Sequence, residues 1–145
     1  MLRKFTLISN NICYGPCPEP NDEVEQRLTV SSNGRVWFSG YNYGGIPGKF
    51  QSGRKLQLNI GSRKAQQLLG LLEQFFANDY LVVMATDVGE WELSLHGDEI
   101  RTYNGSLCED LIVDNIALSD HIRQVIPIEN LFVFDGNIGS EDELF

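Results

Sequence analysis

The feature that most constrains the fold of this chain is the dipeptide Asn33-Gly34, which separates two runs rich in β-branched and aromatic residues. Asn-Gly suits the two φ > 0 positions of a type I′ turn, so residues 24–31 and 35–43 are predicted to form a β-hairpin. A two-residue turn places Val30 opposite Trp37. The alternation then predicts one buried face, made of Leu28, Val30, Trp37 and Tyr41.

A second hairpin is expected at residues 90–104. Apolar and polar residues alternate from Trp91 onward, and Gly97-Asp98 supplies another two-residue turn. In that register Leu95 is opposite Ile100. Both tryptophans of the chain are therefore predicted to be core residues.

One long helix is predicted after the first hairpin. It begins at Ser62, which we expect to be the N-cap, and the pattern ends at Asn78-Asp79. The apolar positions that recur at helical spacing are Ala65, Leu68, Leu69, Leu72, Phe75 and Phe76. A short helix is expected from Ser119, again as the N-cap, through Val125, because Pro127 cannot continue it.

Further strands are expected at residues 2–8, 56–60, 80–86 and 131–134. Two-residue hairpins join antiparallel neighbours, and the chain has only two helical segments. The order therefore predicts an α+β fold, a single largely antiparallel sheet built from hairpins, with one main helix and one short helix. Residues 1–145 are expected to form a single domain with a frayed acidic tail at 136–145.

The charge is segregated along the chain. The net charge is −9, yet residues 26–72 carry seven Lys and Arg and no Asp or Glu, whereas residues 73–145 carry sixteen Asp and Glu against two arginines. Nucleic acid is not an expected partner, because affinity for a polyanion comes from cationic side chains. Two arrangements stay open: the basic and acidic parts neutralise each other as neighbouring strands, or they form separate faces.

The apolar segments and the cysteines indicate the compartment. No apolar stretch approaches the roughly 20 residues that cross a bilayer, and no signal-peptide segment follows Met1. Three cysteines, an odd number, agree with a reducing environment. We therefore expect a cytoplasmic protein with no membrane partner.

The common catalytic motifs are missing from the sequence. Gly48-Lys49-Phe50 is not a phosphate-binding loop, because Tyr43 stands where the leading glycine would be. The two histidines, His96 and His121, lie in different predicted elements, and nothing in the sequence places a cysteine nucleophile beside either. No catalytic residue is assigned, and we favour a protein that is not an enzyme.

Two segments carry weak signals for metals. Cys13 and Cys17 have a spacing found in some zinc sites, but the second pair of ligands typical of a zinc knuckle is missing. Residues 135–137 resemble the start of a calcium loop, but Gly139 stands at the fifth position. We expect no metal and no cofactor.

The region 40–64 is the candidate ligand site. It combines glycines and aromatic residues with cations, and it leads into the start of the main helix, where exposed N–H groups suit an anion. The candidate anion-binding residues are Tyr41, Tyr43, Arg54, Lys55, Arg63 and Lys64. The competing interpretation is that Arg63 and Lys64 reach carboxylates of the acidic half of the chain.

Part of the chain resembles a family of small bacterial proteins of unknown function. The resemblance covers residues 85–136 and rests on residues 91–95, a turn, residues 103–107, then residues 118–123 and 131–136. It implies a hairpin, a short helix and a strand, and it implies no activity and no site residues.

Two functions follow from these observations. The first is a non-catalytic, acidic, cytoplasmic interaction module, an inhibitor-like or immunity-like protein that binds a basic surface of a protein partner. The second is a domain that binds an anionic small molecule such as a phosphate or nucleotide, or a modest enzyme acting on one, through region 40–64.

Overall fold

The computed structural model describes residues 2–12, 18–46, 49–77, 88–108 and 111–136. Six strands form one antiparallel sheet in the order β4-β3-β2-β1-β5-β6. Their bounds are β1 (Lys4–Asn10), β2 (Glu23–Ser31), β3 (Arg35–Ile46), β4 (Lys49–Asn59), β5 (Glu90–His96) and β6 (Ile100–Ser106). The largely antiparallel α+β fold is therefore confirmed.

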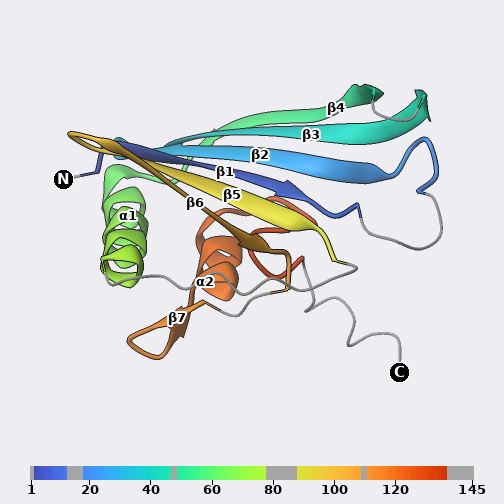
Figure 1. Ribbon diagram of the computed structural model, residues 1–145. Helices are drawn as coiled ribbons and strands as arrows, with labels where there is room; N and C mark the ends of the chain where they lie inside the picture. The colour runs from blue at the N-terminus through green and yellow to red at the C-terminus, as the bar shows by residue number, and fades with distance from the viewer. Residues whose placement is uncertain (1, 13–17, 47–48, 78–87, 109–110, 137–145) are drawn as a thin grey trace.

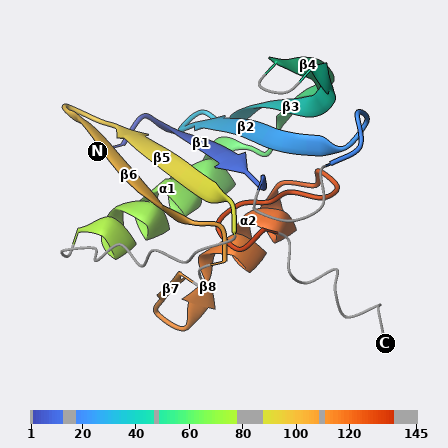
Figure 2. The same ribbon diagram turned by 45° about the vertical axis from the view of Figure 1, so that its right-hand side comes forward.

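Both helices lie on the same face of the sheet (Figure 1). They are α1 (Ser62–Phe76) and α2 (Leu118–Val125). A two-stranded hairpin, β7 (Ile112–Val113) and β8 (Ile116–Ala117), lies on the side of α2 away from the sheet (Figure 2). The core between sheet and helices includes Phe5, Leu7, Phe38, Leu68, Leu72, Trp91, Leu93, Ile122 and Phe134.

The first hairpin has a longer turn than predicted. Gly34 N donates to Ser31 O over 2.9 Å, and Gly34 has φ +97°, so the turn has three residues and ends in the left-handed region. Val30 is therefore opposite Val36, and Trp37 is opposite Thr29. The prediction that Trp37 and Tyr41 share the buried face with Val30 is wrong, because one extra turn residue exchanges the two faces of β3.

The second hairpin differs from the prediction in the same way. His96 is opposite Ile100 and Leu95 is opposite Arg101, so three residues close the turn in place of Gly97-Asp98. The register of β5 against β1 keeps Trp91 on the helix side, where it is 1% exposed. The prediction that Trp91 is a core residue is confirmed.

The helix starts differ from their predicted caps. Gly61 caps α1 and Ala117 caps α2, while Ser62 and Ser119 are already helical. The predicted apolar stripe of α1 is confirmed for its buried members, Ala65, Leu68, Leu69, Leu72 and Phe76. Gly34 is required beside Gly61, because a Cβ on Gly34 would lie 2.6 Å from the Gly61 carbonyl carbon.

The predicted strand 131–134 is wrong. Residues 131–132 have no regular structure and residues 133–136 form a turn; the segment 131–134 is buried under the sheet, on the helix side (Figure 1). Polar side chains bind the segment: Ser9 Oγ donates to Val133 O over 2.7 Å, and Gln26 Oε1 accepts from Phe132 N over 2.7 Å. Val133 has φ +49°, which a β-branched residue adopts only when its surroundings impose it.

Three predictions fall outside the described residues. They concern the strand at 80–86, the loop that carries Cys13 and Cys17, and the tail from residue 137 onward. Two strands differ in their limits: β4 begins at Lys49 and not at Leu56, and β1 spans Lys4–Asn10 in place of 2–8.

Candidate functional site

The structure does not bring the six candidate anion-binding residues together. Tyr41 and Lys55 lie on the sheet face away from the helices, and Arg54 lies on the helix side. Arg63 and Lys64 lie just beyond the end of β4. The end of that strand is about 16 Å along the strand from Arg54. The remaining residue, Tyr43, lies farther along β3 with its ring centroid 6.4 Å from that of Phe50.

Arg54 already has a partner. Its Nε and Nη2 donate to the two carboxylate oxygens of Glu23 over 2.9 and 2.7 Å, and its guanidinium carbon lies 4.9 Å from the centroid of the Phe38 ring. The hydrogen bond to Glu23 raises the pKa of Arg54 above its ordinary value. Gly40 makes room for this pair, because a Cβ there would lie 2.0 Å from Glu23 Oε2.

Arg63 and Lys64 are exposed in the first turn of α1, which contains no acidic residue. Neither side chain forms an ion pair within the part of the chain that the structure describes. The expectation that they reach carboxylates of the acidic half is therefore not met there. Anion binding at this helix start stays a prediction.

The sheet face away from the helices, called the open face from here on, carries two complete rows of side chains. Among the described residues no helix or strand covers this face (Figure 1). The first row consists of Gln57, Trp37, Thr29, Thr6, Ser94 and Thr102, and the second of Lys55, Ser39, Arg27, Ile8, Glu92 and Asn104. Each row crosses all six strands in register.

Trp37, Arg27 and Tyr41 lie along one stretch of the open face: Trp37 and Tyr41 are four residues apart on β3, and Arg27 is opposite Ser39 between them. Trp37 is 37% exposed, and the Arg27 guanidinium carbon lies 5.1 Å from the centroid of the Tyr41 ring. Arg27 Nε also donates to Glu25 Oε2 over 3.2 Å, which holds the guanidinium in place. The result is an ordered surface of two aromatic rings and a cation on rigid strands.

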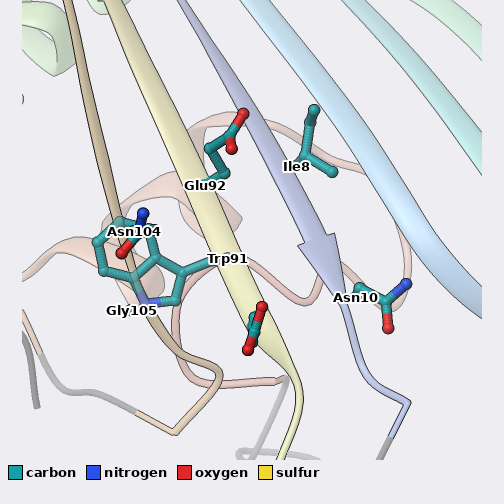
Figure 3. A pocket seen from close by; sticks show the side chains of 7 residues that line it. Ile8, Asn10, Trp91, Glu92, Asn104 and Gly105 are labelled. Carbon is teal, nitrogen blue, oxygen red and sulfur yellow. The ribbon is translucent and has the colours of Figure 1, made fainter. Parts of the chain in front are cut away.

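Two depressions flank this cluster. One, of about 350 Å³, is lined by Lys4, Thr29, Ser31 and Trp37. The other, of about 390 Å³, lies over β1, β5 and β6 and is lined by Ile8, Asn10, Glu90, Trp91, Glu92, Asn104 and Gly105. Figure 3 shows Ile8 and Glu92 on neighbouring strands of the second depression, with Asn10 farther along β1.

The two ends of the open face differ in charge. At one end Lys4 and Arg3 place two positive charges near His96, and burial together with these charges lowers the pKa of His96 below its ordinary value. At the other end Glu90 and Glu92 are exposed and have no ion pair among the described residues. Along β1 and β5 the face therefore offers cations at one end and carboxylates at the other, whereas Arg27 and Lys55 carry positive charge on β2 and β4.

The residues of the open face were missed at the sequence level, apart from Tyr41 and Lys55. The sequence does contain a pattern that identifies residues of this face, because Glu92, Ser94 and His96 alternate with buried residues. Arg27 likewise alternates with Leu28. Trp37 was assigned to the wrong face because a two-residue turn was predicted at Asn33-Gly34.

The described residues contain no group of three His, Cys, Asp or Glu side chains able to hold a metal ion. His96 lies at the end of β5 and His121 lies on α2, whose neighbours Leu118, Ser119 and Ile122 are buried under the sheet. Neither described helix is long and apolar enough to cross a membrane.

Neither the protein-family models nor the curated proteins compared with this chain match it. The resemblance of residues 85–136 to small bacterial proteins therefore stays a prediction. The geometry of the open face is the basis for assigning a function.

Proposed function

We propose that this protein is a non-catalytic interaction module that binds a protein partner through its open face. The observation that carries the proposal is that Trp37, Arg27 and Tyr41 lie on the open face, which no helix or strand of the described residues covers. Trp, Arg and Tyr are the residue types most enriched at the energetic centres of protein interfaces. On this chain they stand on paired strands, so little conformational entropy is lost when a partner docks.

The depressions beside the cluster give the partner's side chains places to bind. Thr29 lines the depression next to Trp37, and its hydroxyl lies 3.2 Å from that of Thr6. These hydroxyl groups can exchange their hydrogen bonds with a partner. Aromatic anchors flanked by polar groups are typical of interfaces that form and dissociate.

The charge of the molecule indicates the partner's chemistry. The net charge is −9, and Glu90 and Glu92 leave two carboxylates without an ion pair on the open face among the described residues. A partner with a basic surface is attracted over long range and pairs with these groups on contact. This supports the inhibitor-like or immunity-like role.

The proposed compartment is the cytoplasm. Cys108 is an exposed free thiol, a state that a reducing compartment preserves.

The proposal is tested by comparing what immobilised variants capture from a lysate of the source cells. Trp37→Ala/Tyr41→Ala should lose the proteins that the wild type enriches, because it removes the aromatic anchors. Arg63→Ala/Gln67→Ala is the matched control on exposed positions of α1 and should retain them. Capture that survives in the first variant and is lost in the second would move the binding site to the helix start.

A further inference from the structure

Strand β4 is an edge of the sheet within the part of the chain that the structure describes. It pairs with β3 on one side and ends the strand order. Its last five residues, 55–59, pair one-to-one with residues 35–39 without a bulge. The edge of a sheet presents N–H and C=O groups that another strand can pair with.

The register shows which amide groups of β4 point outward. Ile60 N donates to Gly34 O over 2.9 Å, in the same register that places Leu58 opposite Val36. In an antiparallel pair the bonded residues alternate, so Leu56 and Leu58 direct their amides to β3. Lys55, Gln57 and Asn59 therefore direct their main-chain N–H and C=O groups away from the sheet.

The helix side of this edge leaves apolar surface uncovered. Leu56 is 40% exposed and Leu58 is partly buried, although their partners Phe38 and Val36 are fully buried. An additional strand beside β4 would place every second side chain over these leucines. Burial of such surface adds to the energy of the main-chain hydrogen bonds.

The charge of the edge selects the occupant. Lys49 and Lys55 on β4, and Arg63 and Lys64 just beyond its end, have no ion pair within the described residues. This edge is positive in a protein of net charge −9. A second copy pairing through its own β4 would bring like charges together, whereas an acidic strand is attracted.

From these observations we propose that β4 binds an extended acidic segment of a protein partner, which adds a seventh strand to the sheet. Acidic side chains of that segment lie beside Lys55, and apolar ones cover Leu56 and Leu58. Strand addition of this kind takes its affinity from the main chain and its specificity from alternate side chains. The site is separate from the open face, because it uses main-chain groups of β4.

A synthetic peptide of alternating residues, acetyl-Glu-Val-Glu-Val-Glu-Val-Glu-amide, is the probe. Hydrogen exchange of the full chain, followed by NMR, should show the amides of Lys55, Gln57 and Asn59 slowed when the peptide is added. The amides of Leu56 and Leu58 should be unchanged, because they already bond to β3. Unchanged exchange at all three outward amides with saturating peptide would overturn the proposal.

Gln57→Pro tests the role of the main chain. Proline removes the outward N–H and is tolerated on an edge strand, so peptide affinity should fall about tenfold while the far-UV circular dichroism is retained. Gln57→Ala, which keeps the N–H, should bind like the wild type. Equal affinity of the proline and alanine variants would contradict strand addition.

Peptide variants test the same point without changing the protein. A peptide N-methylated at alternate residues on its bonding edge, and one with Lys in place of Glu, should both bind at least about tenfold more weakly. Equal binding of either would refute the proposal. The variant Trp37→Ala/Tyr41→Ala should still bind the acidic peptide, because the peptide uses β4 and not the open face. This proposal can therefore fail or hold independently of the open-face proposal. Loss of peptide binding in this variant would assign the peptide to the open face.

Discussion

At the residue scale, Trp91 and Trp37 have the same side chain and opposite surroundings. Trp91 is 1% exposed, with its ring centroid 4.8 Å from that of Phe134, whereas Trp37 is 37% exposed on the open face. We predict that Trp91→Ala lowers the free energy of unfolding by about 3–5 kcal/mol. Trp37→Ala should lower it by less than about 1 kcal/mol. Urea denaturation of both variants measures this, and equal losses would show that Trp37 is a core residue.

His96 gives a prediction about pH. Burial, then the charges of Lys4 and Arg3, lower its pKa in the folded state, so the folded state binds protons less readily than the unfolded state does. This contribution to stability is complete above about pH 6.5 and is lost progressively as the pH falls below it. The melting temperature of the wild type should therefore drop more than that of His96→Gln between neutral pH and pH 5. Parallel curves for the two proteins would argue against this role.

At the scale of elements, alternation and helical spacing predicted most of the sheet and the buried stripe of α1. Turn length was not predictable, because Asn33-Gly34 fits both a two-residue turn and a three-residue turn that ends in a left-handed glycine. What selects the longer turn is tertiary: Gly34 O accepts from Ile60 N over 2.9 Å, and Gly34 packs against Gly61. The aromatic residues of the open face, Trp37 and Tyr41, were assigned to the wrong face by that one turn residue and so could not be placed from the sequence.

The segment 131–134 shows a second limit at this scale. A short apolar run is typical of a buried strand, but it is equally compatible with any chain segment buried on all sides. In this segment hydrogen bonds from side chains take the place of the main-chain hydrogen bonds that a strand would make. Arg123 Nε and Nη2 donate to Leu131 O over 3.1 and 3.0 Å, and Arg123 also pairs with the Asp135 carboxylate.

Gln26 tests the importance of these contacts. Its amide donates to Asn130 O over 2.6 Å and accepts from Phe132 N over 2.7 Å. Gln26→Leu keeps the volume and removes these two bonds, together with the one that the amide donates to Glu23 Oε1 over 2.8 Å, so we expect a loss of about 2–4 kcal/mol in the free energy of unfolding. Gln51→Leu, on an exposed position of β4, should change it by less than about 0.5 kcal/mol. A small effect of Gln26→Leu would mean that water replaces the lost contacts.

At the scale of the whole molecule, the sheet order separates the charges. The basic residues of 26–72 lie mostly on β2, β3, β4 and α1, whereas β5 carries Glu90 and Glu92, with β1 between the two groups. Because β1 lies between them, Glu90 and Glu92 are not on a strand next to these basic strands. Lys55, Arg27 and Glu92 nevertheless lie on the same face of the sheet, so the predicted alternative of separate positive and negative faces is not met among the described residues. The ion pair between Arg101 and Glu73, over 4.0 Å, lies within residues 73–145 and does not link the two groups.

This separation predicts a salt dependence of partner capture. Raising the NaCl concentration from about 0.05 M to about 0.5 M shortens the screening length several-fold, so attraction of a basic partner weakens. Capture by the wild type should fall with salt, and Glu90→Gln/Glu92→Gln should capture less at low salt and depend less on it. A dependence identical in the two proteins would exclude these carboxylates from the contact.

Binding of a protein partner through the open face can be measured by site-specific photo-cross-linking in the source cells. A photoreactive phenylalanine analogue in place of Trp37 should give one saturable adduct with a single partner protein. The same group in place of Gln67, exposed on α1, should give none. An adduct from position 67 and none from position 37 would show that the partner binds at α1 and not at the open face.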